Sequence, residues 1–470
     1  MTQTVPHETT RETASEDGLR GLGATQALAQ FVSGLRFEDL PAEVVHKAKL
    51  LLRDGLGNQL AASTMAEPAR VAHGLIEELG GTPQATITGY GTRVPVPQAA
   101  MINAMLGHGV ELDDAHGNAL TKSGSLLVPT VMTTGEHLGR SGRDTLAALV
   151  AGYDVIIRTA LAINPGHRKR GYHTTGVVGT IASAAASARQ YGFDAERTAD
   201  ALGLGAMQAA GIQAYLDSPC MAKPLSPGKA AFNGTLATML VNRGFTGPKR
   251  GLESPEGFFN AYGDGVNLDE IFVGLGSDFK VMEVGFKPHA ACRYSHGPID
   301  AAQAIRGQAS FELDDVAHVK VFMCELAIRQ SGRTVVPNLN AAMGSTPFSV
   351  ALALLRGANG LADYELGFAD QRAHEVAAEV ELVAEPAYGL MGRQAVVEVT
   401  LRDGSVLRHA VEGPKGEPEL PLTEEELETK FVGLAQLALG EARAREVSEQ
   451  VMAFEQLDNV ADLASTLVRA

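Results

Sequence analysis

The densest group of ionisable side chains is the segment Glu111-Leu-Asp-Asp-Ala-His116, which places three carboxylates and one imidazole in six consecutive residues. Charged groups in a partly buried place repel one another and lose hydration, so they persist where proton transfer or a charged ligand offsets that cost. The polar loop from Gly117 to Ser125 follows directly. The segment indicates proton-transfer chemistry, with a solvated helix end as the competing interpretation.

Basic and imidazole side chains that could hold an anion occur in three other segments, each bordered by glycine or proline. In the first, His173 follows Arg168-Lys-Arg170 and precedes a small-residue helix, whose N-terminus and neighbouring hydroxyls favour an anion. In the second, Lys223 lies in a loop that Pro224 and Pro227 restrain. The competing interpretations are a capping or core histidine, a solvated basic loop and a surface lysine.

The third segment gathers a lysine, two histidines, a thiol and an arginine between Lys287 and His296. It falls at a predicted domain junction, where ligand sites often lie. Metal binding is a rival role, but no carboxylate accompanies the histidines at chelating spacing. Cys292 is either a nucleophile or, more commonly for a cysteine, a small buried hydrophobe.

Composition describes a soluble globular chain of 470 residues, 45% hydrophobic and 20% charged, with room for two or three domains. The net charge of −16 argues against nucleic acid and membrane surfaces as partners, so an anionic substrate needs a local basic pocket. The three cysteines are far apart, which indicates no disulfide framework, zinc or iron-sulfur motif and favours the cytoplasm. No phosphate-binding loop and no apolar stretch approaching about 20 residues is evident.

Two changes of periodicity divide the chain. Residues 1–22 are polar and are predicted to form a disordered tail, whereas apolar residues recur at helical spacing over residues 23–279. The helices predicted there are Pro41–Ala62, Arg70–Leu79, Gln98–Leu112, Arg143–Ile163, Thr180–Tyr191, Ala195–Gln208 and Gly228–Asn242. The one convincing strand in this half is Ala85–Thr88, and the small residues from Ala182 to Ala188 permit close helix contact.

Residues 280–417 have mixed periodicity. We predict a helix over His296–Arg306 and strands over His318–Met323, Val380–Val383, Val396–Leu401 and Val406–Val411, in antiparallel hairpins. Helical patterning returns in residues 418–470, behind a start signal at Thr423. The predicted fold is therefore mainly α: a large all-α bundle domain built from both chain ends, plus a smaller α+β lid domain.

These segments together resemble the MmgE/PrpD family, whose members include 2-methylcitrate dehydratase, cis-aconitate decarboxylase and iminodisuccinate epimerase. Five motifs occur in the same order as in the family. They are Glu111–His116, Gly171–Thr180, Lys223–Ala231, Gly244–Pro248, and Lys287-Pro with Cys292–His296 and Ile299–Ala302. The resemblance implies a helical domain, a lid, a cleft between them and a homodimer. It also implies action on small di- or tricarboxylates without metal or cofactor, at the carbon next to a carboxylate.

The resemblance also assigns residues. His173 falls on an active-site histidine and Lys223 on an active-site lysine, while Lys287, Arg293 and His296 fall on a basic wall that faces the lid. Each departure from the family pattern affects the expected chemistry. Thr121-Lys122-Ser123 stands where the family usually has His-Pro-Ser, and Phe348 stands where the decarboxylase type has a tyrosine. Ser226, His289 and Glu111 depart from the pattern as well. These differences argue against citrate-type dehydration and cis-aconitate decarboxylation.

The leading hypothesis is a cofactor-independent lyase or isomerase for a small polycarboxylate. His173 serves as acid and base, Lys223 as electrophilic partner, and the acidic side chains orient these groups or the substrate. Lys122 replaces the missing imidazole, which requires a pKa well below that of free lysine. The expected catalytic residues are Glu111, Asp113, Lys122, His173 and Lys223. The expected substrate-binding residues are Asp114, His116, Thr121, Ser123, Lys287, Cys292, Arg293, His296 and Phe348. The alternative hypothesis is a catalytically silent, carboxylate-binding homodimer.

Overall fold

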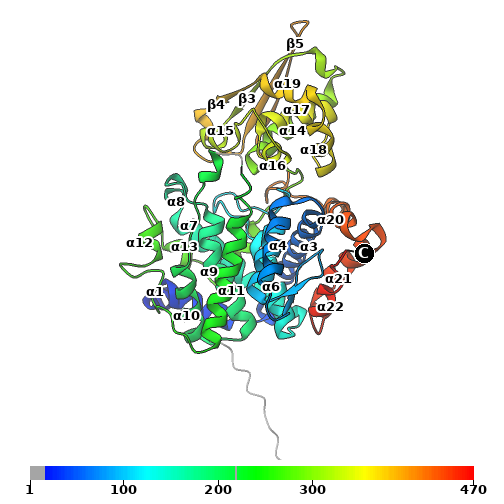
Figure 1. Ribbon diagram of the computed structural model, residues 1–470. Coiled ribbons are helices and arrows are strands. Elements are labelled where there is room, and N and C mark those ends of the chain that lie inside the picture. Colours follow the sequence, from blue (N-terminus) through cyan, green and yellow to red (C-terminus); the bar gives the residue numbers. More distant parts are fainter. Residues whose placement is uncertain (1–15, 218–219, 470) are drawn as a thin grey trace, which may run out of the picture.

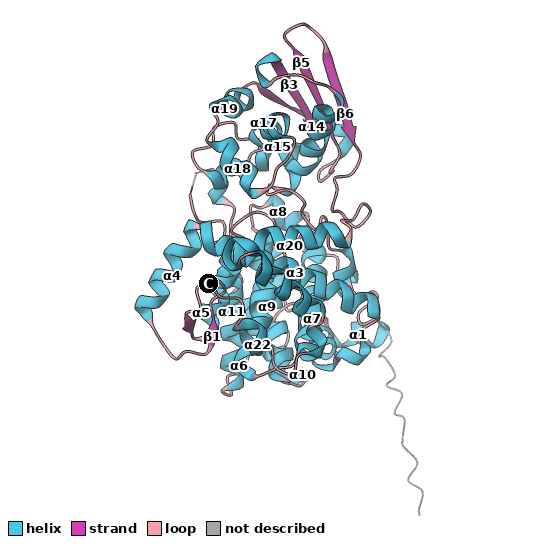
Figure 2. Cartoon of the chain, turned by 90° about the vertical axis from the view of Figure 1, so that its right-hand side faces the viewer, coloured by secondary structure: helices cyan, strands magenta, loops and turns pink. Residues whose placement is uncertain are grey.

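The computed structural model describes residues 16–217 and 220–469, which form a large helical domain and a smaller lid above it (Figure 1). The lid carries its helices on one side of a four-stranded sheet (Figure 2). The predicted fold class, mainly α with a smaller α+β domain, is therefore confirmed.

The helical domain contains most of the helices and a short two-stranded sheet. Its α-helices are α1 (Glu16–Leu22), α2 (Ala24–Gly34), α3 (Ala42–Met65), α4 (Glu67–Leu79), α5 (Val96–Gly107), α6 (Gly124–Leu138), α7 (Gly142–Ile163), α8 (Gly166–Lys169), α9 (Thr174–Tyr191), α10 (Ala195–Met207), α11 (Leu225–Asn242), α12 (Phe258–Tyr262), α13 (Asp269–Phe272), α20 (Glu424–Leu439), α21 (Glu441–Met452) and α22 (Ala461–Ala464). Strands β1 (Ala85–Thr86) and β2 (Arg93–Val94) pair antiparallel. The 3₁₀ turns of the chain are η1 (Phe37–Asp39), η2 (Ala214–Leu216), η3 (Lys280–Glu283), η4 (Arg293–Ser295), η5 (Leu313–Asp315), η6 (Pro386–Tyr388) and η7 (Phe454–Gln456).

Helix α9 lies at the centre of this domain and contacts α6, α7, α10 and α11. Its small side chains let α11 approach closely, because a Cβ added at Gly234 would lie 2.5 Å from Ser183 Cβ. Helix α7 is long and apolar enough to cross a membrane, contrary to the expectation that no stretch would be. It is buried inside the bundle, where Arg158 Nε binds Asp154 Oδ1 at 2.9 Å.

Both ends of the chain build this domain. Helices α20 and α21 pack on α3, and Arg469 N–H donates to the carbonyl of Gly89 at 3.1 Å. At the other end the structure corrects the predicted tail of residues 1–22. Residues 1–15 lie outside the described residues, but Glu16–Leu22 forms α1, which contacts α2 and α13. Leu19 of α1 belongs to the hydrophobic core, which explains why this part is helical.

The chain passes from the helical domain into the lid near Gly285 and returns near Gly416, and the residues between these two points form the lid. Its α-helices are α14 (His296–Gln308), α15 (Glu325–Ser331), α16 (Leu339–Met343), α17 (Thr346–Arg356), α18 (Leu361–Phe368) and α19 (Gln371–Ala378). Its strands are β3 (Val316–Met323), β4 (Val380–Ala384), β5 (Ala395–Leu401) and β6 (Val406–Val411), in the order β4-β3-β5-β6. The strand positions agree with the sequence pattern, but β4 pairs parallel to β3, not in a hairpin. Helices α15 to α19 separate these two strands and so allow the parallel pairing.

The two crossings run side by side at the domain junction. Gly285 and Ala115 exchange backbone hydrogen bonds of 2.9 and 3.0 Å, and Phe286 N–H donates to the carbonyl of Gly416 at 2.8 Å. Gly416 has φ 90°, and a Cβ there would lie 1.9 Å from the Phe286 carbonyl oxygen, so only glycine fits. The acidic segment is thereby tied to the hinge between the domains.

The acidic segment itself is irregular. Helix α5 ends at Gly107 instead of continuing to Leu112, and the polar loop gives way at Gly124 to α6, a helix that was not predicted. A Cβ at Gly107 would lie 2.8 Å from the carbonyl oxygen of Ser125, so the two helices meet closely at this point. Residues 108–123 therefore form a tightly bound loop between two buried helices.

Candidate active site

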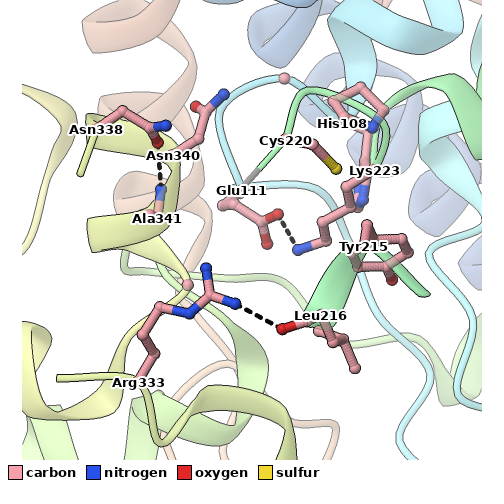
Figure 3. Close-up of a pocket in the computed structure, with 13 residues that line it drawn as sticks. His108, Glu111, Tyr215, Leu216, Cys220, Lys223, Arg333, Asn338, Asn340 and Ala341 are labelled. Atoms are coloured by element: carbon pink, nitrogen blue, oxygen red, sulfur yellow. Dashed lines mark hydrogen bonds and ion pairs between the residues drawn. The ribbon is translucent and has the colours of Figure 1, made fainter. Parts of the chain in front are cut away.

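A small, polar chamber lies between the helical domain and the lid, and residues of both domains line it. An outer pocket shares Glu111, Tyr215 and Lys223 with this chamber and faces Arg333 and Asn340 of the lid (Figure 3). Seven of the predicted site residues line the chamber, namely Glu111, His116, Lys122, His173, Lys223, Cys292 and Arg293. The other predicted residues do not, namely Asp113, Asp114, Thr121, Ser123, Lys287, His296 and Phe348.

Glu111 is the centre of a buried ion cluster. Its φ of 54° lies in the left-handed region, which costs energy for a residue other than glycine and is typical of functional sites. Its carboxylate pairs with the ammonium of Lys223 and lies 3.6 Å from Lys287 Nζ, as Figure 3 shows for Lys223. Lys287 Nζ also donates to the backbone carbonyl of Glu111 at 2.8 Å, so this lysine holds the strained residue in place.

The neighbouring charges determine the protonation states of Glu111 and Lys223. Burial by itself would raise the pKa of Glu111, but Lys223 and Lys287 outweigh it and lower the pKa to about 2. Burial by itself would lower the pKa of Lys223, but Glu111 outweighs it and raises the pKa above the usual lysine value. At neutral pH the pair is therefore a carboxylate and an ammonium.

Asp113 lies behind this cluster and orients two basic groups. Its Oδ2 is 2.7 Å from His108 Nδ1, and its Oδ1 is 3.3 Å from Lys287 Nζ. Burial would raise the pKa of Asp113, but His108 and Lys287 outweigh it and hold the pKa well below the usual range. His108 Nε2 is buried and has no hydrogen-bond partner in the described part of the chain. A carboxylate that fixes one nitrogen of an imidazole leaves the other free for proton transfer.

His173 caps the beginning of α9 and faces the chamber. Its Nδ1 lies 2.7 Å from Ser226 Oγ at the start of α11, and its ring lies 6.3 Å from that of His108 and 5.9 Å from that of Tyr215. Burial and the nearby His108, Lys122 and Lys223 charges lower the pKa of His173 well below the usual value. The imidazole is therefore neutral and able to accept a proton.

Lys122, the lysine of the Thr121-Lys-Ser123 segment, lines the chamber. It has no carboxylate within ion-pair distance among residues 16–217 and 220–469. Burial, together with the charge of Lys287, lowers the pKa of Lys122 to about 8, although Asp113 acts in the opposite direction. This is the direction that an acid or base role requires, because both protonation states then exist near neutral pH.

Two predicted residues of the acidic segment have structural partners instead. The Tyr153 hydroxyl and the Gly124 N–H each donate to a carboxylate oxygen of Asp114 at 2.8 Å. Burial raises the pKa of Asp114 to about 7. The structure therefore places Asp114 behind the loop, where it fastens α6, and not at a substrate surface.

His116, Thr121 and Ser123 shape the loop. His116 lies in the chamber wall, but its Nε2 is 2.9 Å from Glu283 Oε2 and its Nδ1 accepts from the Ala119 N–H at 3.1 Å. The Ser123 hydroxyl donates to Thr121 Oγ1 at 3.2 Å, and both side chains are buried outside the chamber. Of these three predicted substrate-binding residues, only His116 lines the chamber.

The lid contributes Cys292 and Arg293 to the chamber. Arg293 pairs with Glu417 at 2.9 Å and lies 3.2 Å from His296 Nδ1, which places His296 behind the wall. Phe348 differs most from its expected place. It is fully buried in the lid core, with its ring 5.1 Å from that of His374, because α17 runs through the middle of the lid.

The sequence analysis missed several chamber residues. Tyr215 and Arg393 line it but carried no sequence signal, and Arg168 was interpreted as part of a solvated loop. Tyr294 also lines it; this residue lies inside the Cys292–His296 motif but was not singled out. His108 could have been noticed, because it lies one helical turn before the acidic cluster. Among the described residues, no group of three or more histidine, cysteine or acidic side chains is arranged to hold a metal ion.

The fold and the site define the protein class. The chain matches the MmgE/PrpD N-terminal domain over residues 26–271 and the MmgE/PrpD C-terminal domain over residues 289–456, and it belongs to this family. The family predicted from the sequence motifs is thus confirmed.

Similar proteins occur in fungi and animals. Cis-aconitate decarboxylase of Aspergillus terreus is 25% identical, over 96% of this chain and 97% of that protein. The cis-aconitate decarboxylase-like protein oryM of Aspergillus oryzae is 27% identical, over 94% and 97%. Cis-aconitate decarboxylase of Homo sapiens is 25% identical, over 94% of each chain. The expectation of a lyase-type enzyme is confirmed by these relatives.

Proposed function

We propose that this protein decarboxylates a small di- or tricarboxylate and that its own side chains, not a bound metal, supply the charge stabilisation. The observation that carries the proposal is the charge balance of the chamber. Glu111 and Asp113 are matched by Lys223 and Lys287, whereas Arg293 is matched by Glu417.

Three further cations remain in the chamber. Lys122, Arg168 and Arg393 line it without any carboxylate within 4.0 Å in the described part of the chain. Partly buried cations are costly unless an anion joins them, so the chamber favours a ligand with two or three negative charges. The same charges disfavour a divalent cation. The cis-aconitate decarboxylases among the relatives act on an acid of this kind.

The chemistry follows from the states of the side chains. In decarboxylation the bond from carbon to one carboxylate breaks, carbon dioxide leaves, and the electron pair remains on the carbon skeleton next to another carboxylate. The ammonium of Lys223 stabilises this developing charge. Lys122, with a pKa of about 8, is mostly protonated at pH 7 and donates the proton that forms the new C–H bond. Solvent then returns a proton to Lys122.

His173 has the complementary role. Because it is neutral, it accepts a proton when the reaction begins by removing one from the carbon next to a carboxylate. That step leads to isomerisation or to loss of hydroxide, which are the other reactions expected of this site. Decarboxylation results when loss of carbon dioxide comes first and Lys122 then donates a proton. Isomerisation or loss of hydroxide results when His173 first removes a proton.

The test is to incubate the purified protein with cis-aconitate and related di- and tricarboxylates in D₂O. Carbon dioxide release and one deuterium on the product carbon would support decarboxylation, and Lys122→Met should abolish both. Lys169→Met removes an exposed lysine of α8 next to the chamber and is the matched control. Deuterium exchange without carbon dioxide release would instead indicate an epimerase. Binding without either signal would leave the silent carboxylate-binding protein as the answer. A homodimeric, cytoplasmic form stays a prediction.

A further inference from the structure

We propose that Arg393, Tyr294 and Arg168 form a subsite for a second carboxylate of the substrate, separate from the carboxylate at the reacting carbon. The proposal rests on the proposed function, because it specifies which acids the chamber accepts. Arg393 and Tyr294 come from the lid, and Arg168 comes from α8 of the helical domain.

Two of these side chains carry buried donors that have no partner. The hydroxyl of Tyr294 and the Nη1 of Arg393 are both buried, and neither has a hydrogen-bond partner in the described part of the chain. Tyr294 is only 6% exposed. Buried donors are almost always paired in folded proteins, so two unpaired donors on neighbouring chamber residues indicate that a ligand completes them.

The two side chains are held next to each other. The guanidinium of Arg393 lies over the Tyr294 ring, 4.3 Å from its centre, and its Nη2 donates to the carbonyl of Gly117 at 3.2 Å. Stacking and one hydrogen bond fix the plane of the guanidinium and leave Nη1 for a ligand. Gly117 belongs to the helical domain, so Arg393 is oriented by both domains.

Arg168 brings a second positive charge to the same place. Its charge and that of Arg393 both act on the Tyr294 hydroxyl, and Arg168 also acts on His173. Its Nη2 lies 3.4 Å from the amide oxygen of Gln330, which is a weak contact. The subsite therefore combines positive charge from both domains in the chamber that His173 also lines.

A carboxylate is the group that fits these donors. Its two oxygens accept several hydrogen bonds, so one group can receive the Arg393 Nη1–H and the Tyr294 O–H while its charge is balanced by Arg168. A substrate bound at both ends would bridge the lid and the helical domain. The subsite thus selects acids that carry a carboxylate away from the reacting carbon.

The test measures the affinity for propane-1,2,3-tricarboxylate by titration calorimetry, so that no turnover is needed. We expect Arg393→Met to weaken binding about 10- to 100-fold and Tyr294→Phe about 3- to 10-fold, as removal of a charged and a neutral hydrogen bond should. Tyr294→Phe keeps the ring that Arg393 stacks on, so it preserves the packing. Arg408→Met on β6 and Tyr388→Phe are the matched controls in the same domain, and both should bind as the native protein does.

The outcomes separate this proposal from the proposed function. Loss of affinity in both variants would support the subsite even where no acid is decarboxylated, and the catalytic proposal alone would then fail. Affinity within twofold of native in Arg393→Met and Tyr294→Phe would overturn the subsite and would mean that water satisfies these donors. Failure of the native protein to bind the tricarboxylate would also overturn it.

Discussion

Lys122 provides the sharpest test of how the site works. Its pKa of about 8 replaces the 10.5 of a free lysine, so the protein disfavours the charged form by at most about 3 kcal/mol. Since the folded pKa lies below the unfolded one, the unfolded chain binds more protons between pH 8 and pH 10.5. The penalty is therefore complete below about pH 8 and disappears as the pH rises through that window.

Lys122→Met removes this penalty. We expect the variant without ligand to melt about 3 °C higher than the native protein at pH 7, and we expect the difference to vanish above about pH 10.5. The same variant should lose at least about 100-fold in kcat/KM, because the proton donor is gone. Scanning calorimetry across pH and a carbon dioxide release assay measure the two effects.

Ligand binding gives the opposite pH dependence. If the charged lysine attracts the acid, the Kd of propane-1,2,3-tricarboxylate should rise about 10-fold between pH 7 and pH 9, as the protonated fraction falls. Lys122→Arg should bind with little change over this range, because arginine stays charged. Lys229 on α11 also has a pKa of about 8 but lies outside the chamber, so Lys229→Met should keep the native profile. If the Kd of Lys122→Arg rose between pH 7 and pH 9 as much as the Kd of the native protein, the reasoning would be refuted.

Three further predictions concern two residues of the acidic segment and one residue of the lid core. Glu111→Gln leaves the buried Lys287 and the half-buried Lys223 without their shared carboxylate, so we expect a loss of at least about 100-fold in kcat/KM and a lower melting temperature; near-native activity would contradict the role of this carboxylate. Asp114→Asn should keep activity within a few fold. Because burial raises the pKa of Asp114 to about 7, native stability should fall as the pH rises from about 4 to 7, and thermal melts of the variant should lack this fall. Phe348→Tyr adds a hydroxyl to a fully buried position, so denaturant unfolding should show a loss of about 1 to 3 kcal/mol and the assay no gain in decarboxylation; a gain would place this ring at the substrate.

Local sequence signals were reliable wherever neighbours along the chain decide the structure. Thr423 caps α20 by accepting from the backbone N–H three residues later, as its residue type indicated. The strands of the lid sheet began and ended close to the predicted residues, because alternation of apolar side chains is a local pattern. Where α5 ends was missed, because close packing of Gly107 against Ser125 decides it.

Some properties of the candidate site residues could be predicted from the sequence, and others depend on the tertiary structure. The sequence by itself determined the family and the two-domain fold, and it grouped the acidic segment, His173 and Lys223 as candidates for one site, because these depend on residue types and motif order. Only the tertiary structure decided that Lys122 has a lowered pKa, that Asp114 is a fastening residue and that Arg393 stacks on Tyr294. Each of these depends on burial and on charges that come from distant parts of the chain. Such effects are summed over space and have no counterpart in the order of the residues.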